Sequence, residues 1–316
     1  MKIIDFHCDT IHKIYHNEKE NLYENSYSVD IKKLIKGNYI GQFFALFIDQ
    51  KWISKNKIDI YLHLKDFYKV FIDQINVNEE YIKLARDYND LKNNMRENKI
   101  SAFFTVEEGD FLQGKLERLD EFYELGLRLI TLTWNYENSI GYPNSKDRNI
   151  MSKGLKPFGF EVIERMNDLG MIIDVSHLSD GGFYDCINHS KKPIIASHSN
   201  ARALKNVTRN LSDEMLKHLG NKGGVVGINF APDFLGDDGI SRIEYMINHI
   251  KHMVNIGGIE SPSIGTDFDG ITGQLEINNS GEMGMLISAF IKAGFNSREI
   301  EKICYGNAIR IIKECL

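Results

Sequence analysis

The chain has 316 residues, which is enough for one large α/β domain with a well-buried core. Hydrophobic residues make up 42% of it and charged residues 26%, proportions that are typical of globular proteins and exclude a disordered chain. The net charge of −6 gives no electrostatic attraction to nucleic acid or to an anionic membrane surface, so neither is expected as a partner.

The sequence also indicates the cellular location and the state of the cysteines. No apolar stretch has the length of a membrane span, and residues 1–20 contain charges too early for a signal peptide, so we expect a cytoplasmic protein. The four cysteines are scattered without a CxxC pair and are expected to be free thiols. Cys8 lies between His7 and Asp9, and strand alternation should turn it away from both.

Eight short apolar runs, rich in β-branched and aromatic residues, alternate with longer segments of helical periodicity. This alternation is typical of βαβ units around a parallel sheet, and eight repeats favour a closed (β/α)8 barrel over an open doubly wound sheet. We expect one such domain over residues 1–316. The predicted strands are 3–7, 41–48, 102–107, 127–133, 171–177, 193–198, 225–230 and 263–267.

Helices are predicted between these strands, and some of their ends carry capping residues. Gly170 follows the segment MNDL and suits a left-handed C-terminal cap, while Ser179 can cap the start of the next helix. The predicted helices lie at 58–98 (as two helices), 114–125, 157–169, 179–189, 211–219, 240–256, 281–292 and 297–315.

Residues that can bind a metal follow five of the predicted strands. In a (β/α)8 barrel the C-terminal ends of all strands meet around one mouth, where catalytic groups gather. A single histidine at such a position is more often structural, but five strand ends of this kind favour a metal centre. The residues are His7, Asp9, Glu107, Glu108, His177, His198, Asp267 and Asp269.

The negative charge of the carboxylates at this mouth requires a compensating positive charge. Placing Asp9, Glu107 and Asp267 together in a partly desolvated site without a cation would cost several kcal/mol. Two divalent cations would offset most of that charge, and neutral His177 and His198 would complete the coordination. The residues therefore predict a metal-dependent hydrolase with a two-metal site.

Longer segments around these residues match a known pattern: DFHCDT, TVEEG, LRLITLTWN, GLKPFGFEVIERMNDLGMIIDVSH, PIIASHSNARALKNVTRN, GGVVGINF, IGTDFDG and GNAIRII. Over nearly its whole length the chain resembles the membrane dipeptidase (renal dipeptidase) family of zinc peptidases, as a bacterial-type cytoplasmic member. The order IDVSH, SHSNAR, DFDG is specific to that family, whereas HxD or DFDG alone is not.

The resemblance implies two zinc ions, although other divalent cations also suit these ligands. His7 and Asp9 would bind the first ion. His177 and His198 would bind the second ion, and Glu107 would bridge the pair.

Glu107 is preferred as the bridge over its neighbour Glu108. In the family pattern the bridging glutamate directly follows the strand and precedes glycines. This chain has Glu-Glu-Gly where Glu-Gly-Gly is frequent, so Glu108 departs from the pattern.

Further roles are also implied by the resemblance. Asp267 matches the acid/base aspartate, and Arg209 matches the arginine that meets the substrate carboxylate or the tetrahedral intermediate. Asn229 is expected to contact the substrate. Trp134 stands where mammalian members carry a histidine that contacts the substrate, and Phe234 stands where they carry a tyrosine. Both are expected at the substrate site, with an altered substrate range.

The expected reaction is hydrolysis of a dipeptide, including one with a C-terminal D-residue. Two cations would lower the pKa of a bridging water, and the resulting hydroxide would attack the peptide carbonyl. Asp267 would carry the proton to the leaving amine. Asp269 is the weaker candidate, although strand alternation would place it on the same face. Arg209 would hold the free C-terminal carboxylate and restrict the substrate to dipeptides.

Two other functions stay open. Another barrel metallohydrolase, such as a deaminase, lactonase or phosphoesterase, is the alternative, because the fold hosts many chemistries. HxD in place of HxH on the first strand disfavours many of these. A non-enzymatic binding protein is disfavoured by the intact ligand set and Asp267. The resemblance also implies a homodimer.

Overall fold

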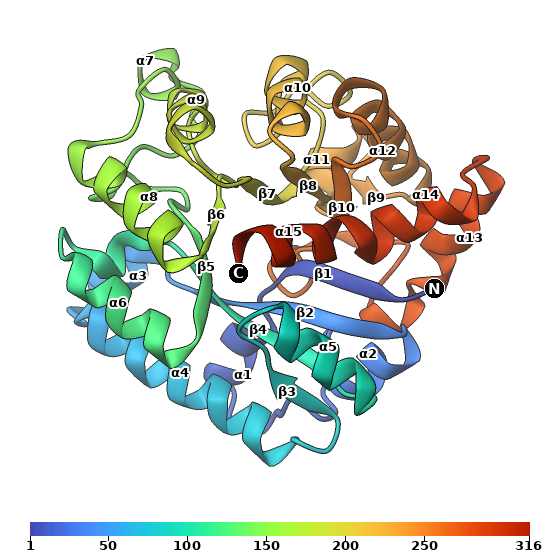
Figure 1. Cartoon of the computed structure of the whole chain (residues 1–316), viewed down its shortest axis with the longest axis horizontal. Helices are drawn as coiled ribbons and strands as arrows, with labels where there is room; N and C mark the ends of the chain where they lie inside the picture. The colour runs from blue at the N-terminus through green and yellow to red at the C-terminus, as the bar shows by residue number, and fades with distance from the viewer.

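The structure is a computed structural model that describes residues 1–316. Its main sheet is a ring of eight parallel strands, because β2 pairs with β4 and β10 pairs with both β1 and β8. The strands are β1 (Ile3–Cys8), β2 (Tyr39–Phe47), β4 (Ile100–Glu107), β5 (Leu127–Thr131), β6 (Ile172–Asp174), β7 (Ile195–Ser199), β8 (Val225–Ile228) and β10 (Pro262–Ile264). The predicted (β/α)8 barrel is confirmed (Figure 1).

Helices surround this ring (Figure 1). The larger ones are α4 (Ile60–Val77), α5 (Tyr88–Arg96), α6 (Leu116–Leu125), α8 (Pro157–Leu169), α9 (Asp180–His189), α10 (Asp213–Asn221), α12 (Ile243–Gly257), α13 (Gly284–Lys292) and α15 (Asn307–Cys315). Short ones lie in the connections: α1 (Thr10–Tyr15), α2 (Ile31–Lys36), α3 (Gln50–Asn56), α7 (Arg148–Met151), α11 (Pro232–Leu235) and α14 (Ser297–Glu301).

The predicted helix caps are present. Gly170 ends α8 with φ of 75°, a left-handed conformation that glycine adopts without steric cost. Ser179 begins α9, and its hydroxyl accepts a hydrogen bond from the backbone N–H of Gly182 at 3.1 Å. Both contacts satisfy helix-end groups that would otherwise lack a partner.

The structure corrects the prediction for residues 58–98 and 297–315. A three-residue strand, β3 (Ile82–Leu84), separates α4 from α5 and pairs with the first half of β4, whereas β5 pairs with the second half. Three residues are too few for a periodic pattern to reveal. The C-terminal segment is also not one α-helix, because a π-helical stretch at Lys302–Gly306 joins α14 to α15.

The barrel is closed at one end by α15. Its residues Ala308, Ile311 and Ile312 pack against the apolar interior formed by the early residues of the strands, among them Ile4 and Ile40. Figure 1 views the molecule from this side, with α15 across the barrel axis. The opposite end, where the strands finish, is therefore the end that can hold a site.

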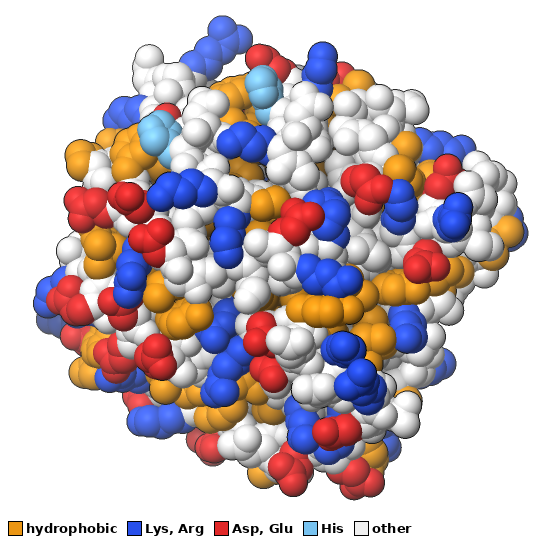
Figure 2. Space-filling view, in the orientation of Figure 1, with side chains coloured by type: hydrophobic (Ala, Val, Ile, Leu, Met, Phe, Trp, Pro, Cys, Tyr) orange, Lys and Arg blue, Asp and Glu red, His pale blue; other side chains and the backbone are white.

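The distribution of surface charges and the state of the cysteines can be compared with the sequence-based expectations. On the face shown in Figure 2, acidic and basic side chains are interspersed. No helix is both long and apolar enough to cross a bilayer. All four cysteines are buried and free, as predicted, and Cys8 packs in the apolar layer with side chains such as Phe44 and Phe268.

Candidate metal centre

The five predicted ligands converge at the C-terminal mouth of the barrel. His7 lies in β1, Glu107 ends β4 and His198 lies in β7. Asp9 directly follows β1 at the start of α1, and His177 lies in the turn after β6. All five are buried, with exposed fractions between 0% and 9%.

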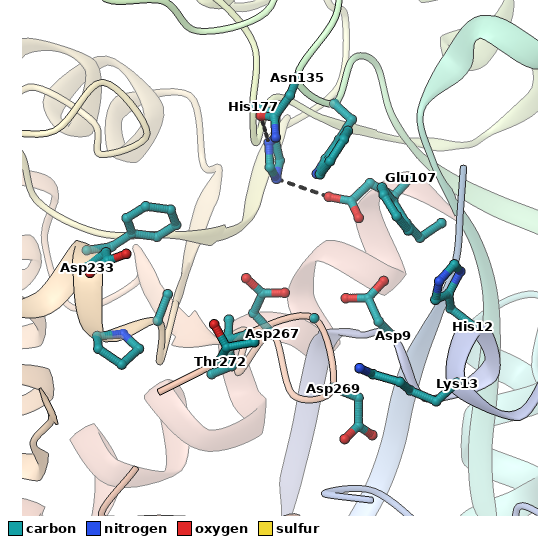
Figure 3. Close-up of a pocket in the computed structure, with 17 residues that line it drawn as sticks. Asp9, His12, Lys13, Glu107, Asn135, His177, Asp233, Asp267, Asp269 and Thr272 are labelled. Carbon is teal, nitrogen blue, oxygen red and sulfur yellow. Dashed lines mark hydrogen bonds and ion pairs between the residues drawn. The ribbon is translucent and has the colours of Figure 1, made fainter. Parts of the chain in front are cut away.

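Glu107 stands between two groups of ligands. One carboxylate oxygen, Oε1, lies 3.1 Å from His177 Nε2 and 3.4 Å from His198 Nε2. The other oxygen, Oε2, lies 3.6 Å from His7 Nε2, which is itself 3.3 Å from Asp9 Oδ2. Figure 3 shows the carboxylate of Glu107 directed at His177. Each oxygen of Glu107 therefore faces a different pair of potential ligands.

The chemistry of this cluster fits divalent cations. Both ring nitrogens of His7 and one oxygen of Asp9 are buried without a hydrogen-bond partner, although such atoms are normally satisfied. Three sets of three ligand atoms lie within 4.8 Å of one another, and one of them consists of His7, Asp9 and Glu107. Another joins Glu107 to His177 and His198, and the third joins His7 and His198 to Asp267. Imidazole nitrogens with carboxylate oxygens are ligands that zinc prefers.

Hydrogen bonds behind two histidines orient their metal-facing nitrogens. His198 Nδ1 lies 2.7 Å from the Ser197 hydroxyl, which donates to Asp174 at 2.5 Å. His177 Nδ1 lies 3.2 Å from Asn135 Oδ1. Both oxygens can accept a hydrogen bond from Nδ1, and the tautomer with the proton on Nδ1 leaves each Nε2 lone pair free to bind a cation.

The electrostatics of the cluster match a ligand set. Burial lowers the pKa of His177 and His198 well below the usual range, so both rings are neutral. Burial also raises the pKa of Glu107 well above its usual value. Burial opposes charge on His7, but attraction to Glu107 and the neighbouring aspartates outweighs it and raises the pKa of His7 to about 10. A cation would take over this compensating role from a proton.

Asp267 lies beside the cluster but is held in a different way. Its Oδ1 is 3.8 Å from His7 Nε2, and its Oδ2 accepts a hydrogen bond from Asn229 Nδ2 at 2.9 Å. Burial raises the pKa of Asp267 to about 7. Asn229 is fully buried and does not line the cavity over the cluster. The structure thus places Asn229 against Asp267.

His177 and Asp267 both have left-handed backbones, with φ of 67° and 61°. This conformation costs about 1–2 kcal/mol in a residue with a side chain. The N–H of Asp267 donates to His7 O at 3.2 Å, and the N–H of Asn144 donates to His177 O at 2.7 Å. These bonds hold both turns, which bring the two side chains back over the barrel mouth.

A cavity of about 380 Å³ opens above the cluster. Asp9, Glu107, His177 and Asp267 form part of its wall, together with Trp134 and Phe234. Its size lies within the range of small-molecule sites. Trp134 and Phe234 thus lie at the wall of this cavity.

Arg209 lies at a neighbouring cavity. It does not line this cavity but a second one of about 740 Å³, and Phe234 lines both. The guanidinium carbon of Arg209 lies 5.5 Å from the Phe234 ring centroid, and its Nη2 donates to His198 O at 3.0 Å. Its Nε is buried and has no partner. Arg209 therefore reaches the metal cluster's backbone, with Phe234 beside it.

Comparisons with known proteins identify the family. The membrane dipeptidase family (peptidase family M19) matches residues 1–315. An uncharacterised dipeptidase of Schizosaccharomyces pombe is 31% identical over 337 aligned residues, covering 99% of this chain and 80% of that protein. An uncharacterised protein from the pqqA 5′ region of Klebsiella pneumoniae is 34% identical over 229 residues, 69% of this chain and 83% of that one. The chain belongs to the membrane dipeptidase family.

A solved structure gives the same fold. A metallopeptidase of Rhodobacter sphaeroides, liganded with a phosphinate mimic of the dipeptide L-Ala-D-Ala, superposes with a TM-score of 0.88 at 22% identity. The match covers 100% of this chain and 99% of that one. Such low identity supports the barrel fold alone. Membership of the membrane dipeptidase family confirms the predicted enzyme class, a metallo-dipeptidase.

Glu108 departs from the family pattern, and the structure shows what it contacts. Its φ is 97°, a region that favours glycine. Its carboxylate faces away from the ligands and accepts hydrogen bonds from Trp134 N at 3.0 Å and Asn138 Nδ2 at 2.5 Å. Burial raises the pKa of Glu108 to about 7. Glu108 therefore anchors the loop that carries Trp134 and Asn135 into the site.

We expect Glu108→Ala to destabilise the fold by about 2 kcal/mol, because it leaves the backbone N–H of Trp134 and one of the two amide N–H groups of Asn138 without an acceptor. Metal content should not change. Thermal unfolding with metal analysis measures both. A variant as stable as the wild type would contradict this anchoring role.

Asp269 corrects a prediction from strand alternation. β10 ends at Ile264, so Asp267 and Asp269 lie in a turn where alternation does not apply. The carboxylate of Asp269 accepts from Thr10 Oγ1 at 2.5 Å and from Ser28 N at 2.8 Å. Figure 3 shows it pointing away from Asp267 and Asp9. Asp269 thus ties its own turn to the start of α1 and to the loop that contains Ser28.

Sequence reasoning missed the residues behind the ligands. Asp174, Ser197 and Asn135 were not singled out, yet they orient His198 and His177. Asp174 also accepts from Thr131 Oγ1 at 2.6 Å. The available signal was their position: Asp174 and Ser197 lie within the segments IDVSH and SHSNAR.

Proposed function

We propose that this chain hydrolyses the peptide bond of dipeptides, including dipeptides with a C-terminal D-residue, with two divalent cations, zinc by preference. His7 and Asp9 would hold one cation, and His177 and His198 the other. The observation that carries the proposal is Glu107, whose two oxygens face the two ligand groups separately.

Bound divalent cations would supply an activated water and polarise the scissile carbonyl. Asp267 would hold the proton taken from that water and pass it to the leaving amine, which requires hydrogen-bond reach of both atoms. Its position supports this role, because Oδ1 faces the ligand cluster and Oδ2 is fixed by Asn229. Burial favours the protonated form that this transfer needs.

Arg209 would bind the free C-terminal carboxylate of the substrate. Its buried Nε has no partner, and a planar guanidinium suits a carboxylate. A side-chain movement of Phe234, which lines both cavities, would open this contact. Fixing the carboxylate one residue from the scissile bond would restrict the enzyme to dipeptides. The dipeptide mimic bound by the Rhodobacter sphaeroides enzyme supports L-Ala-D-Ala as a trial substrate.

The test combines metal analysis with a substrate panel. We expect about two equivalents of zinc per chain after loading, and hydrolysis of L-Ala-L-Ala, L-Ala-D-Ala and Gly-D-Ala. A lactone and a phosphotriester represent the alternative barrel hydrolases. Zinc-loaded protein that cleaves the lactone or phosphotriester but no dipeptide would overturn the proposal.

Metal removal provides a separate prediction. A chelator should abolish dipeptide hydrolysis and lower the melting temperature, because the folded state loses bound cations and keeps its crowded carboxylates. Adding zinc should restore both. Calorimetry and activity assays on the same samples measure this. Full activity in protein free of metal would contradict the prediction.

The expected homodimer and cytoplasmic location stay predictions. Light scattering on the purified chain measures the first. Fractionation of the source cells measures the second.

A further inference from the structure

A third cavity, of about 300 Å³, adjoins the metal cavity and is not used by the proposed mechanism. His12 and Phe47 line both this cavity and the metal cavity, so the two open beside each other. His12 stands at the wall of the metal cavity in Figure 3. The remaining walls are His16, Asp49, Trp52 and His63.

The position of this cavity relates it to one end of a substrate. Phe47 ends β2, and Asp49 and Trp52 follow it. Arg209 follows β7, and in the ring order β1-β2-β4-β5-β6-β7-β8-β10 the strands β2 and β7 stand opposite each other. A dipeptide whose carboxylate meets Arg209 would therefore present its N-terminal residue to the cavity beside β2.

The walls are aromatic. The ring centroid of Trp52 lies 5.5 Å from that of His16 and 5.5 Å from that of His63. The ring centroid of His12 lies 5.2 Å from that of Phe47. Faces of such rings attract cations as well as apolar groups. These histidines belong to none of the clusters in which three ligand atoms approach closely enough to share an ion, so the cavity is not a further metal site.

The charge of the cavity wall indicates whether a cationic or an apolar group would bind there. Burial lowers the pKa of His12 to about 4 and lowers the pKa of His16 and His63, so the imidazoles are uncharged near neutrality. Asp49 is then the only charged side chain in the wall. No ion pair neutralises it, and its neighbour Lys51 lies over the Tyr136 ring instead.

Asp49 has an oxygen to spare. Its Oδ1 caps α3 by accepting from Lys51 N at 2.9 Å and Trp52 N at 3.3 Å, while Oδ2 takes part in no hydrogen bond of the chain. An aromatic cavity with one free carboxylate oxygen is complementary to an ammonium or guanidinium group.

We propose that this cavity binds the side chain of the substrate's N-terminal residue and selects a cationic one, lysine or arginine. The inference rests on the proposed dipeptidase function and adds a substrate class to it. Asp49 would pair with the cation, and Trp52 would cover it.

The experiment compares kcat/KM of the zinc-loaded enzyme for Lys-Ala, norleucine-Ala, Phe-Ala and Ala-Ala. Norleucine has nearly the length of lysine without the charge. We expect Lys-Ala to exceed norleucine-Ala by about tenfold, the scale of one hydrogen bond to a charged group. Asp49→Asn should reduce this ratio to about one and leave Ala-Ala within about twofold, because asparagine caps helices as well as aspartate does.

Asp59→Asn is the matched control. The Oδ1 of Asp59 caps α4 in the same way, accepting from Tyr61 N at 2.9 Å and Leu62 N at 3.1 Å, but Asp59 lines neither cavity. Its ratio should equal that of the wild type. Trp52→Leu should lower Lys-Ala by about threefold through the lost ring contact.

Two outcomes would overturn the inference. One is a wild-type preference for Phe-Ala or norleucine-Ala over Lys-Ala, and the other is a full lysine preference that persists in Asp49→Asn. In either case hydrolysis of Ala-Ala would leave the proposed function standing. Hydrolysis of no dipeptide at all would overturn both.

Discussion

Glu107→Gln is expected to lose at least one equivalent of zinc and to lower kcat/KM for L-Ala-L-Ala by about 10⁴-fold. The carboxylate is the only group that approaches His7 with one oxygen and both His177 and His198 with the other. A glutamine offers one oxygen and an amide that cannot bind a cation, so one side of the site loses a ligand. Losing several kcal/mol of electrostatic stabilisation of the transition state corresponds to this fall in rate.

The neighbouring residue supplies a control for this substitution. Glu108→Gln makes the same chemical change one residue along, at a side chain that is equally buried but faces Trp134 N and Asn138. It should keep both zinc ions and most of the activity. Metal analysis and steady-state kinetics on the two variants measure the difference. Equal zinc content in Glu107→Gln and the wild type would rule out the bridging role.

The candidate metal centre could be predicted from the sequence because its residue types are uncommon at strand ends. Glu107 and His198 lie in strands whose bounds the hydrophobic pattern located to within two residues. The parallel barrel then requires that their side chains meet, since all strands end at one mouth. The fold class and the candidate ligands were predicted from the same pattern.

The turns around the site could not be predicted in this way. β6 ends three residues before His177 and β10 ends three residues before Asp267. Both residues adopt left-handed conformations that no local preference of histidine or aspartate requires. Hydrogen bonds from distant parts of the chain impose them, so they are a consequence of the tertiary fold. For the same reason alternation failed for Asp269.

The hydrogen-bond partners of common polar residues could likewise not be predicted from the sequence. Asn229, Ser197 and Asp174 are common residue types, and their contacts depend on which strands become neighbours. β7 lies between β6 and β8, which brings Asp174 under Ser197. The placement of Arg209 beside Phe234 also depends on packing between the loop after β7 and α11. The sequence therefore indicated that Arg209 and Phe234 matter, but it did not predict how they contact each other.

Asp267→Asn should retain both zinc ions but lower kcat by about 10³-fold, within the range of general acid–base catalysis. Asparagine fills the same space, but it cannot accept a proton from the attacking water. The proposed roles leave Asp267 out of the ligands of the metal pair, and its Oδ1 lies 3.8 Å from His7 Nε2. KM should change little, because no bond to the substrate carboxylate is lost.

Asp269→Asn is the matched comparison, because Asp269 lies two residues away with a similar left-handed backbone, φ 71° against 61°. Its bonds to Thr10 and Ser28 hold loops rather than a proton in transit, so its kcat should stay within about threefold of the wild type. A comparable fall in kcat for both variants would mean that the loss reflects disruption of the loop. An unchanged kcat in Asp267→Asn would show that another group carries the proton, because an amide cannot pass a proton to the leaving amine.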